Sequence, residues 1–249
     1  SDGNDLESFN FGTGFNIGIM GNLLLNDYFV FRGELMYSQK GVEYVFDGPS
    51  YFFFNLPSGS ELQTSGNRRT FVDITNSYVD IPVLAYAKFG RFELMGGVNA
   101  GFLIASLGDG SITYSGESPN GTPINELDIQ LNYNFIGDSP GDLGDNTEIR
   151  TLSIDGQTIE VPNSIGAYYD FSDDRGNLFN RFDFGVVGGL SVYLNGGLFI
   201  NGRINYGLVD ITNDEVDVSP TELDGNGNLV NRSDDDRNLV IQTSIGFRF

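Results

Sequence analysis

The sequence is dominated by segments in which apolar residues alternate with small polar residues at a period of two. In residues 9–20, the odd positions are mostly Phe and Ile, and the even positions from 10 to 18 are Asn and Gly. Successive side chains of a β-strand point to opposite faces, so such a segment predicts a strand with one apolar face and one small polar face. The same pattern recurs in residues 28–40, 77–88, 91–104, 181–193, 198–209 and 238–249. The chain is therefore predicted to be all-β.

These segments are suited to a membrane. They run to about 10–13 residues, close to the ~9–11 that a tilted strand needs to cross a bilayer and longer than the ~5–6 usual in soluble strands. Their apolar faces carry no charge, and their polar faces carry Gly, Asn and Ser with a few charges of both signs. A soluble antiparallel sandwich also alternates. The uncharged apolar faces favour an antiparallel transmembrane β-barrel; a soluble lipocalin-like ligand-binding barrel, with apolar residues inside, is the less favoured alternative.

Composition argues against several other classes of protein and site. No stretch approaches the ~18–20 apolar residues of a membrane-spanning helix, and the acidic start of the chain, residues 1–11, is not a signal peptide, which indicates a processed or trimmed chain. There is no cysteine, so disulfides and thiolate metal sites are excluded. The net charge of −21 argues against nucleic acid as a partner, because a phosphate backbone requires a basic surface.

The connections between the segments alternate between short and long. The short ones are residues 21–27, 89–90 and 195–197, and the other three span about 30, 70 and 25 residues. Transmembrane barrels have short periplasmic turns and long external loops. All the net charge lies in residues 1–8, 41–71, 106–178 and 212–237. We therefore expect these acidic segments outside the cell.

The number of strands poses a question of parity. Seven alternating segments are visible, whereas bacterial single-chain barrels normally have an even number of strands. We expect eight strands, with the eighth either preceding Ser1 or supplied by a neighbouring chain, the first being favoured.

The long connection 106–178 has structure of its own. Thr151–Val161 alternates around Asp155–Gly156, a pair that favours a tight hairpin. Residues 111–115 and 129–136 are candidates for further strands. The chain is thus expected to be one barrel domain, 1–249, with 106–178 inserted as an extracellular loop or cap.

The absence of histidine limits catalysis. Small outer-membrane enzymes such as phospholipases, palmitoyl transferases and omptin-type proteases use histidine for proton transfer or nucleophile activation, and this chain has none. A carboxylate site formed by Glu34 with Asp80 or Glu93 is conceivable. A network of ion pairs in the lumen is favoured, because buried charges need partners. Its members would be the acids Glu34, Asp80, Glu93 and Asp183 and the bases Arg32, Lys40, Lys88, Arg181, Arg203 and Arg248. We predict no enzyme, no catalytic residue and no cofactor.

One loop carries oxygen ligands at the spacing of a calcium site. Asp224, Asn226 and Asn228 alternate with glycines and precede Asp234–Asp236, and calcium favours such oxygens. However, Leu229 stands where an EF-hand loop requires glycine. A solvated acidic loop is the favoured interpretation, and no metal is predicted.

The last segment ends in Phe249 with apolar residues at every second position before it. This arrangement resembles the signal that the barrel-assembly machinery reads, and it is equally compatible with an interfacial aromatic girdle. The partners expected are outer-membrane lipid and lipopolysaccharide, this machinery, and other outer-membrane proteins or lipoproteins.

Several motifs also resemble a known family. They are GFNIGI at 14–19, RGELMYSQKG at 32–41, YVDIPVLAYAKFG at 78–90, GGVNAGFL at 96–103, FDFGVVGGLSVYL at 182–194, INYGLVDIT at 204–212 and IGFRF at 245–249. In these motifs and their order the chain is similar to the small outer-membrane β-barrel proteins abundant in Bacteroidetes, known as porin-family or PorT-like proteins. The resemblance implies an eight-stranded barrel with a glycine-rich strand before GFNIGI, and some relatives assist protein secretion.

The expected function is that of a non-enzymatic outer-membrane barrel that presents acidic extracellular loops, as a surface protein or as a structural or accessory subunit of an outer-membrane assembly. A small passive porin is the alternative. It is disfavoured because side chains fill the interior of an eight-stranded barrel.

Overall fold

The computed structural model describes residues 5–56, 59–195 and 197–248. Within these ranges the chain forms one ten-stranded sheet and two separate hairpins. The strands are β1 (Glu7–Phe11), β2 (Asn16–Leu24), β3 (Phe29–Asn55), β4 (Glu61–Phe89), β5 (Phe92–Glu117), β6 (Pro123–Asn134), β7 (Ile149–Ile154), β8 (Gln157–Pro162), β9 (Ser164–Ile165), β10 (Phe182–Tyr193), β11 (Leu198–Gly207), β12 (Val218–Leu223), β13 (Leu229–Asn231) and β14 (Leu239–Phe247). Among the described residues there is no helix of the length and apolarity that a membrane crossing needs.

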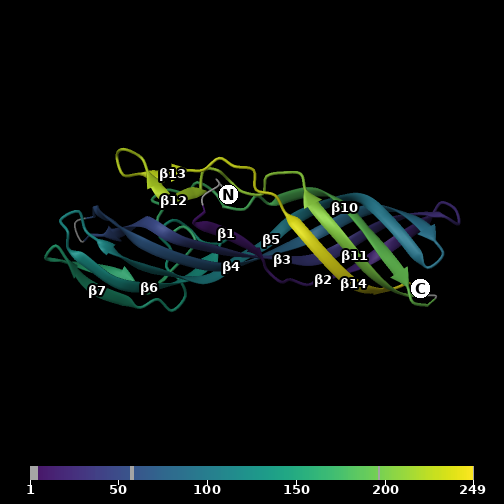
Figure 1. Cartoon of the computed structure of the whole chain (residues 1–249), viewed down its shortest axis with the longest axis horizontal. Coiled ribbons are helices and arrows are strands. Elements are labelled where there is room, and N and C mark those ends of the chain that lie inside the picture. Colours follow the sequence, from purple (N-terminus) through teal and green to yellow (C-terminus); the bar gives the residue numbers. More distant parts are fainter. Residues whose placement is uncertain (1–4, 57–58, 196, 249) are drawn as a thin grey trace.

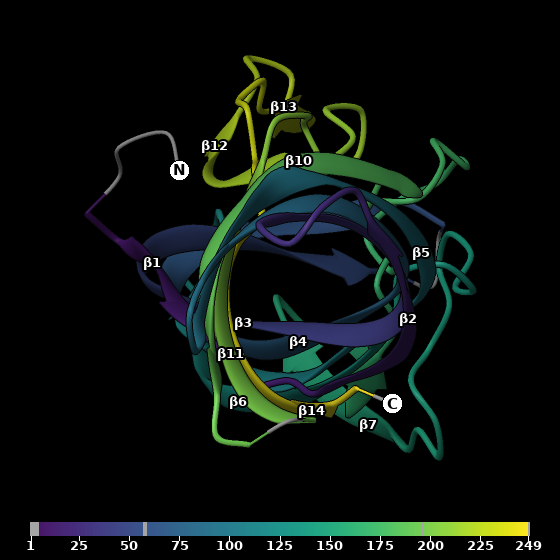
Figure 2. The same cartoon turned by 90° about the vertical axis from the view of Figure 1, so that its right-hand side faces the viewer.

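The molecule is elongated and has two halves (Figure 1). At one end, seven strands pair in the order β2-β3-β4-β5-β10-β11-β14, each antiparallel to its neighbours. Viewed end-on, they curl into a wall around a central space (Figure 2). We call this end the barrel half; it includes residues 29–40 of β3, 77–89 of β4 and 92–104 of β5. The remainder is the distal half.

Each of the seven alternating segments lies in a strand, but the first is divided. Residues 9–20 fall in β1 and β2, both of which pair with β3. The interruption lies where Gly12 and Gly14 approach β3 closely: a Cβ atom would lie 2.6 Å from the carbonyl carbon of Gly41 at the first position and 2.1 Å from the carbonyl oxygen of Gln39 at the second. The glycines allow the chain to follow β3 across the interruption.

The apolar face of the barrel half points outward. Ile19 and Ile245 are each 74% exposed, and Ile17 and Phe247 are also exposed. The inward positions are buried and polar, as Ser38, Asp80 and Asn99 illustrate. The predicted alternation is therefore confirmed, with its apolar side on the outside. A lipocalin-like barrel requires the opposite arrangement, so that alternative is wrong.

The three short connections lie together at the end of the barrel half where β14 ends. The β2–β3 turn spans residues 25–28, the β4–β5 turn spans residues 90–91, and β10 is followed by β11 after residues 194–197. These positions confirm the short connections predicted from the sequence. We call this end the short-turn end.

A β-bulge marks the boundary between the halves on β5. Ser77 pairs with Ala105 and Tyr78 with Leu103, which leaves Ile104 as the extra residue. The exposed positions shift from even to odd numbers here, because Phe102 and Ile104 are exposed before the bulge and Leu107 after it. Beyond this point the same strand enters the distal half.

The connection 41–71 was expected to be a long external loop, and the prediction of a loop was wrong. Strands β3 and β4 continue to Asn55 and Glu61 as one long hairpin, and β5 continues to Glu117. One face of β4 stays exposed along this extension, at the odd positions from 61 to 73, while the other face packs in the distal half. The exposed face is mostly polar there, so the apolar outer face that identified the barrel strands ends at this point.

The distal half has a hydrophobic core. Residues 106–178 contain the end of β5, β6, the β7–β8 hairpin and β9. Asp155 and Gly156 adopt φ of 52° and 74° in the β7–β8 turn, as the predicted hairpin requires, and the predicted strands lie in β5 and β6. Tyr78 and Leu103 reach this core from the edge of the barrel half. Its other buried members are Phe52, Phe54, Val72, Ile74, Ile112, Tyr114, Ile124, Leu127, Ile129, Leu131, Phe135, Ile154, Ile159, Val161, Ile165 and Phe179.

The barrel wall is open between β2 and β14. In the described chain each of these strands pairs on one side only, β2 with β3 and β14 with β11. We call the gap between them the seam. Because every pairing from β2 round to β14 is antiparallel and there are six of them, β2 and β14 run in the same direction.

Candidate functional site

A lysine lies at the centre of the lumen between two aspartates. Lys40 Nζ is 2.8 Å from Asp183 Oδ2 and 3.7 Å from Asp80 Oδ1. It also lies 3.8 Å from the centre of the Tyr78 ring. All four side chains are buried. The ammonium group therefore has both ionic and cation–π partners in place of water.

Two arginines complete the ion-pair network. Arg203 Nη1 lies 2.7 Å from Glu34 Oε2, and its Nε donates to Gln242 Oε1 at 2.6 Å. Arg32 lies 3.6 Å from Glu93 and donates to the Tyr86 hydroxyl at 2.9 Å. These contacts satisfy the guanidinium groups inside the barrel half.

The predicted network is thus largely present. All four predicted acids lie close to a base: Asp80 and Asp183 to Lys40, Glu34 to Arg203, and Glu93 to Arg32. Arg248 also lies 3.6 Å from Glu93. Lys88 and Arg181 form no ion pair within the described residues; Lys88 is half-buried and Arg181 is exposed. In the carboxylate site that we considered, Glu34 and Asp80 are each held by a base. The arrangement neutralises these carboxylates.

Apolar side chains fill the lumen nearer the short turns. Val30, Leu84, Tyr86, Met95 and Val187 form a buried cluster there. Leu84 and Tyr86 are at most 1% exposed. Together with the ion pairs, this cluster fills the central space of the barrel half.

A large cavity lies between the lumen network and the distal core. Its volume is about 1070 Å³, and we call it the distal chamber. Its lining includes Lys40 and Asn76 on the lumen side, Arg68 on β4, Tyr133 on β6 and Asp170 in the segment after β9. Asn16 of β2 and residues 239–243 of β14, on the two edges of the seam, also line it, as do Phe9, Asn10 and Phe11 of β1. The chamber is therefore continuous with the seam.

Sequence reasoning missed the chamber residues. Arg68, Thr70, Val72 and Ile74 follow a period of two along β4, and this pattern is the signal that could have placed Arg68 on an inner face. Asp170 has no such signal, because it lies outside the strands.

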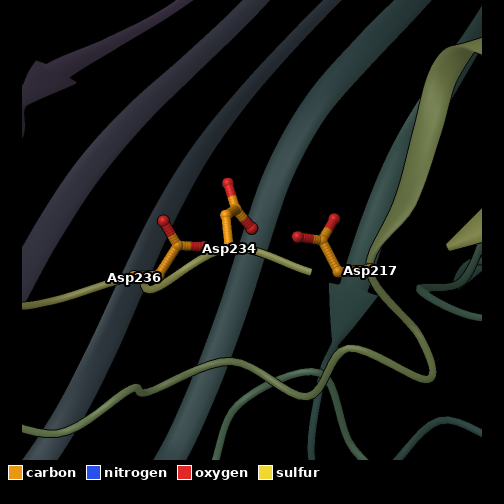
Figure 3. Close-up of side chains that lie close together, drawn as sticks. All are labelled: Asp217, Asp234 and Asp236. Atoms are coloured by element: carbon orange, nitrogen blue, oxygen red, sulfur yellow. The ribbon is translucent and has the colours of Figure 1, made fainter. Parts of the chain in front are cut away.

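A half-buried group of acids lies beside the chamber (Figure 3). One carboxylate oxygen from each of Asp217, Asp234 and Asp236 lies within 4.8 Å of the others. Burial raises the pKa of Asp217, and the Arg232 guanidinium opposes this shift. Arg232 lies 2.8 Å from Asp217 and 2.9 Å from Glu7. This arginine supplies positive charge at the cluster, which is what a cation would otherwise do.

The loop that we considered for calcium is used differently. Asp224 accepts hydrogen bonds from the backbone of Asn226 and Asn228, both at 2.8 Å, and from the Asn228 side chain at 2.9 Å. The Asn228 side chain is the main cause of the lowered pKa of Asp224. These contacts shape the turn of the β12–β13 hairpin. Asp217, which joins Asp234 and Asp236 in space, was not singled out from the sequence.

The terminal strand presents its apolar residues outward. Leu239, Ile241, Ile245 and Phe247 on β14 are all exposed. Phe249, to which the assembly signal was assigned, lies outside the described residues.

Comparison with known families gives a match over most of the chain. The family model for the outer membrane protein beta-barrel domain matches residues 1–213. Neither the curated proteins nor the solved structures compared with the chain gave a match. The matched range covers most of the chain, and it agrees with an all-β structure whose apolar face points outward. The chain therefore belongs to the outer membrane protein beta-barrel domain family and is a protein of the bacterial outer membrane.

Proposed function

We propose that this protein is a non-enzymatic membrane anchor that displays its distal half at the cell surface, as a structural or accessory subunit of an outer-membrane assembly. The observation that carries the proposal is the filled lumen, with Lys40, Asp183 and the apolar cluster across its interior. A barrel of this size that is filled with side chains is a scaffold rather than a channel. The distal half, with its own core, is then the part available to partners.

The orientation follows from the connections. Short turns lie at one end, and the long acidic segments lie at the other. Transmembrane barrels place short turns in the periplasm. On this basis the distal half is extracellular, in contact with lipopolysaccharide, while other outer-membrane proteins or lipoproteins are the partners of the assembly.

We further propose that the complete barrel has eight strands. Because β2 and β14 run in the same direction, one strand running the opposite way would be antiparallel to both. Such a strand, preceding Ser1 or supplied by a neighbouring chain, would satisfy the backbone groups of both edges. The resemblance to the Bacteroidetes porin-family or PorT-like proteins, with their glycine-rich first strand, favours the first source. The terminal strand, ending in Phe249, would be read by the barrel-assembly machinery.

Site-specific crosslinking tests the subunit role. A photo-crosslinking residue at Leu143 or Ile149, both exposed in the distal half, would be activated in intact cells. We expect repeated capture of one outer-membrane protein or lipoprotein by these positions. Val186, exposed on the barrel wall, is the matched control and should crosslink to lipid. Recovery of the barrel without protein crosslinks at several distal positions would contradict the subunit role.

Conductance distinguishes this proposal from the passive porin. The purified protein in planar bilayers should show no stable open steps of nanosiemens size. Such steps would overturn the filled-lumen interpretation and favour the porin.

A further inference from the structure

The distal chamber contains Arg68, an arginine that no described acid pairs with. Arg68 donates from Nε to Thr70 Oγ1 at 2.9 Å and forms no ion pair within the part of the chain that the structure describes. Its neighbour Arg69 has a side chain that is 70% exposed and lies 3.9 Å from Asp47. The two adjacent arginines therefore differ in face: Arg68 lines the chamber, and Arg69 meets bulk solvent.

An aspartate lines the same chamber. Asp170 is accessible to solvent, yet burial raises its pKa, and the Arg68 guanidinium opposes that shift. This combination is expected for a carboxylate that faces a large cavity inside the protein. Its side chain makes no hydrogen bond or ion pair to another described residue.

Aromatic rings form much of the remaining lining. Tyr44, Tyr51, Tyr133, Tyr169 and Phe171 all border the chamber. Burial raises the pKa of Tyr133, and its hydroxyl has no hydrogen-bond partner among the described residues. Three polar groups with spare hydrogen-bonding capacity thus sit among aromatic surfaces, which is the usual composition of a small-molecule site.

The charges restrict the chemistry of an occupant. A purely apolar ligand would displace water from Arg68 and Asp170 and offer them no hydrogen bonds in return, which is unfavourable for charged groups. An anion would be repelled by Asp170, and a cation would be repelled by Arg68. A hydroxyl both donates and accepts hydrogen bonds, so a neutral molecule with several hydroxyls satisfies the carboxylate and the guanidinium together.

We propose that the distal chamber binds a neutral oligosaccharide. The hydroxyls of the sugar pair with Arg68, Asp170 and Tyr133, and the C–H faces of its rings pack on the tyrosines. The chamber measures about 1070 Å³ including the space beside the seam, and the part lined by Arg68, Tyr133 and Asp170 lies on its distal side. This site goes beyond the proposed anchoring role. Arg68, Tyr133 and Asp170 lie in the distal half, away from the seam that an eighth strand would fill.

Glycan screening with matched variants tests the proposal. The full mature chain in detergent micelles is applied to neutral malto-, cello-, manno- and chito-oligosaccharides, to acidic glycans and to short zwitterionic peptides. The best ligand is then titrated by calorimetry. We expect binding to at least one neutral oligosaccharide. Arg68→Met and Asp170→Asn should each weaken this binding at least tenfold.

Two control variants and one conservative variant separate a loss of binding from a loss of folding. Arg69→Met and Asp173→Asn change neighbouring charges that are exposed, with side chains 70% and 62% accessible, and should alter the affinity less than twofold. Tyr133→Phe retains the ring and should weaken binding by three- to tenfold. Circular dichroism and heat-dependent gel mobility verify that each variant is folded. Absence of binding to every neutral oligosaccharide, preference for acidic glycans or peptides, or equal losses in the Arg68 and Arg69 variants would overturn the proposal.

Discussion

Lys40 and Asp183 are 143 positions apart in the sequence, yet their charged groups lie 2.8 Å apart inside the barrel half. They belong to β3 and β10, which are separated in the sheet by β4 and β5. The ion pair therefore crosses the lumen instead of following the wall. Arg203 on β11 and Glu34 on β3 form a second such crossing. Opposite sides of the wall are thus held together through its interior.

Removing the central base should destabilise the barrel. Lys40→Met leaves Asp80 and Asp183 buried without their base, and the expected loss is about 3–5 kcal/mol of unfolding free energy. Urea unfolding in lipid vesicles measures it. Lys88, the only other lysine of the chain, is the control, and Lys88→Met should cost less than about 1 kcal/mol. Equal losses in the two variants would contradict the role given to Lys40.

A second prediction concerns the boundary of the lipid-facing surface. Val98 and Leu107 are both exposed on β5, on either side of the bulge at Ile104. Val98→Arg places a charge against hydrocarbon and should cost about 2–4 kcal/mol, whereas Leu107→Arg should cost less than about 1 kcal/mol. Vesicle unfolding measures both. A larger loss at Leu107 would place the membrane boundary elsewhere.

The turn of the β7–β8 hairpin is held by one carboxylate. Asp155 accepts hydrogen bonds from Thr122, from Ser118 at 2.9 Å and from Asn120 at 3.0 Å. Asp155→Ala removes these bonds and also places alanine at φ 52°. Amide exchange in residues 149–162 should become about tenfold faster, by mass spectrometry. Asp155→Asn retains one acceptor and tolerates this φ, so its effect should be smaller; an equal effect would point to charge alone.

The stability of the distal half at alkaline pH should depend on Tyr51. Burial raises its pKa to about 12, with Arg68 opposing, and its hydroxyl donates to the Ser219 carbonyl at 2.7 Å. The folded state holds this proton more tightly than the unfolded chain, in which the pKa is about 10. The stabilisation is complete below pH 10 and is lost as pH rises toward 12. Thermal melting across this range should fall less steeply in Tyr51→Phe than in the wild type; identical slopes would contradict the assignment.

Much of the barrel half was predictable because the orientation of each side chain is encoded by its neighbours in the sequence. A lipid-facing wall imposes alternation on every strand, so Phe31, Leu94 and Ile241 reveal their orientation through their immediate neighbours. The ion pairs followed from charge inside an enclosed lumen, although which base meets which acid did not, since partners such as Lys40 and Asp183 come from distant strands.

The distal half was harder for the opposite reason. Val42, Val45 and Phe46 of β3 are apolar without strict alternation, and residues on both faces of β3 are half-buried or buried there. The chamber combines Arg68 of β4 with Asp170 of a connecting segment. Only the path of the intervening chain brings those two residues together.

Strands β3, β4 and β5 pass from the barrel half into the distal half with a single bulge and no hinge. A force applied to the distal end therefore acts along the strands and loads their hydrogen bonds in shear, all at once, instead of opening them one after another. The two halves are consequently joined rigidly through continuous strands. In the orientation that we propose, a partner bound by the distal half is coupled mechanically to the wall in the membrane.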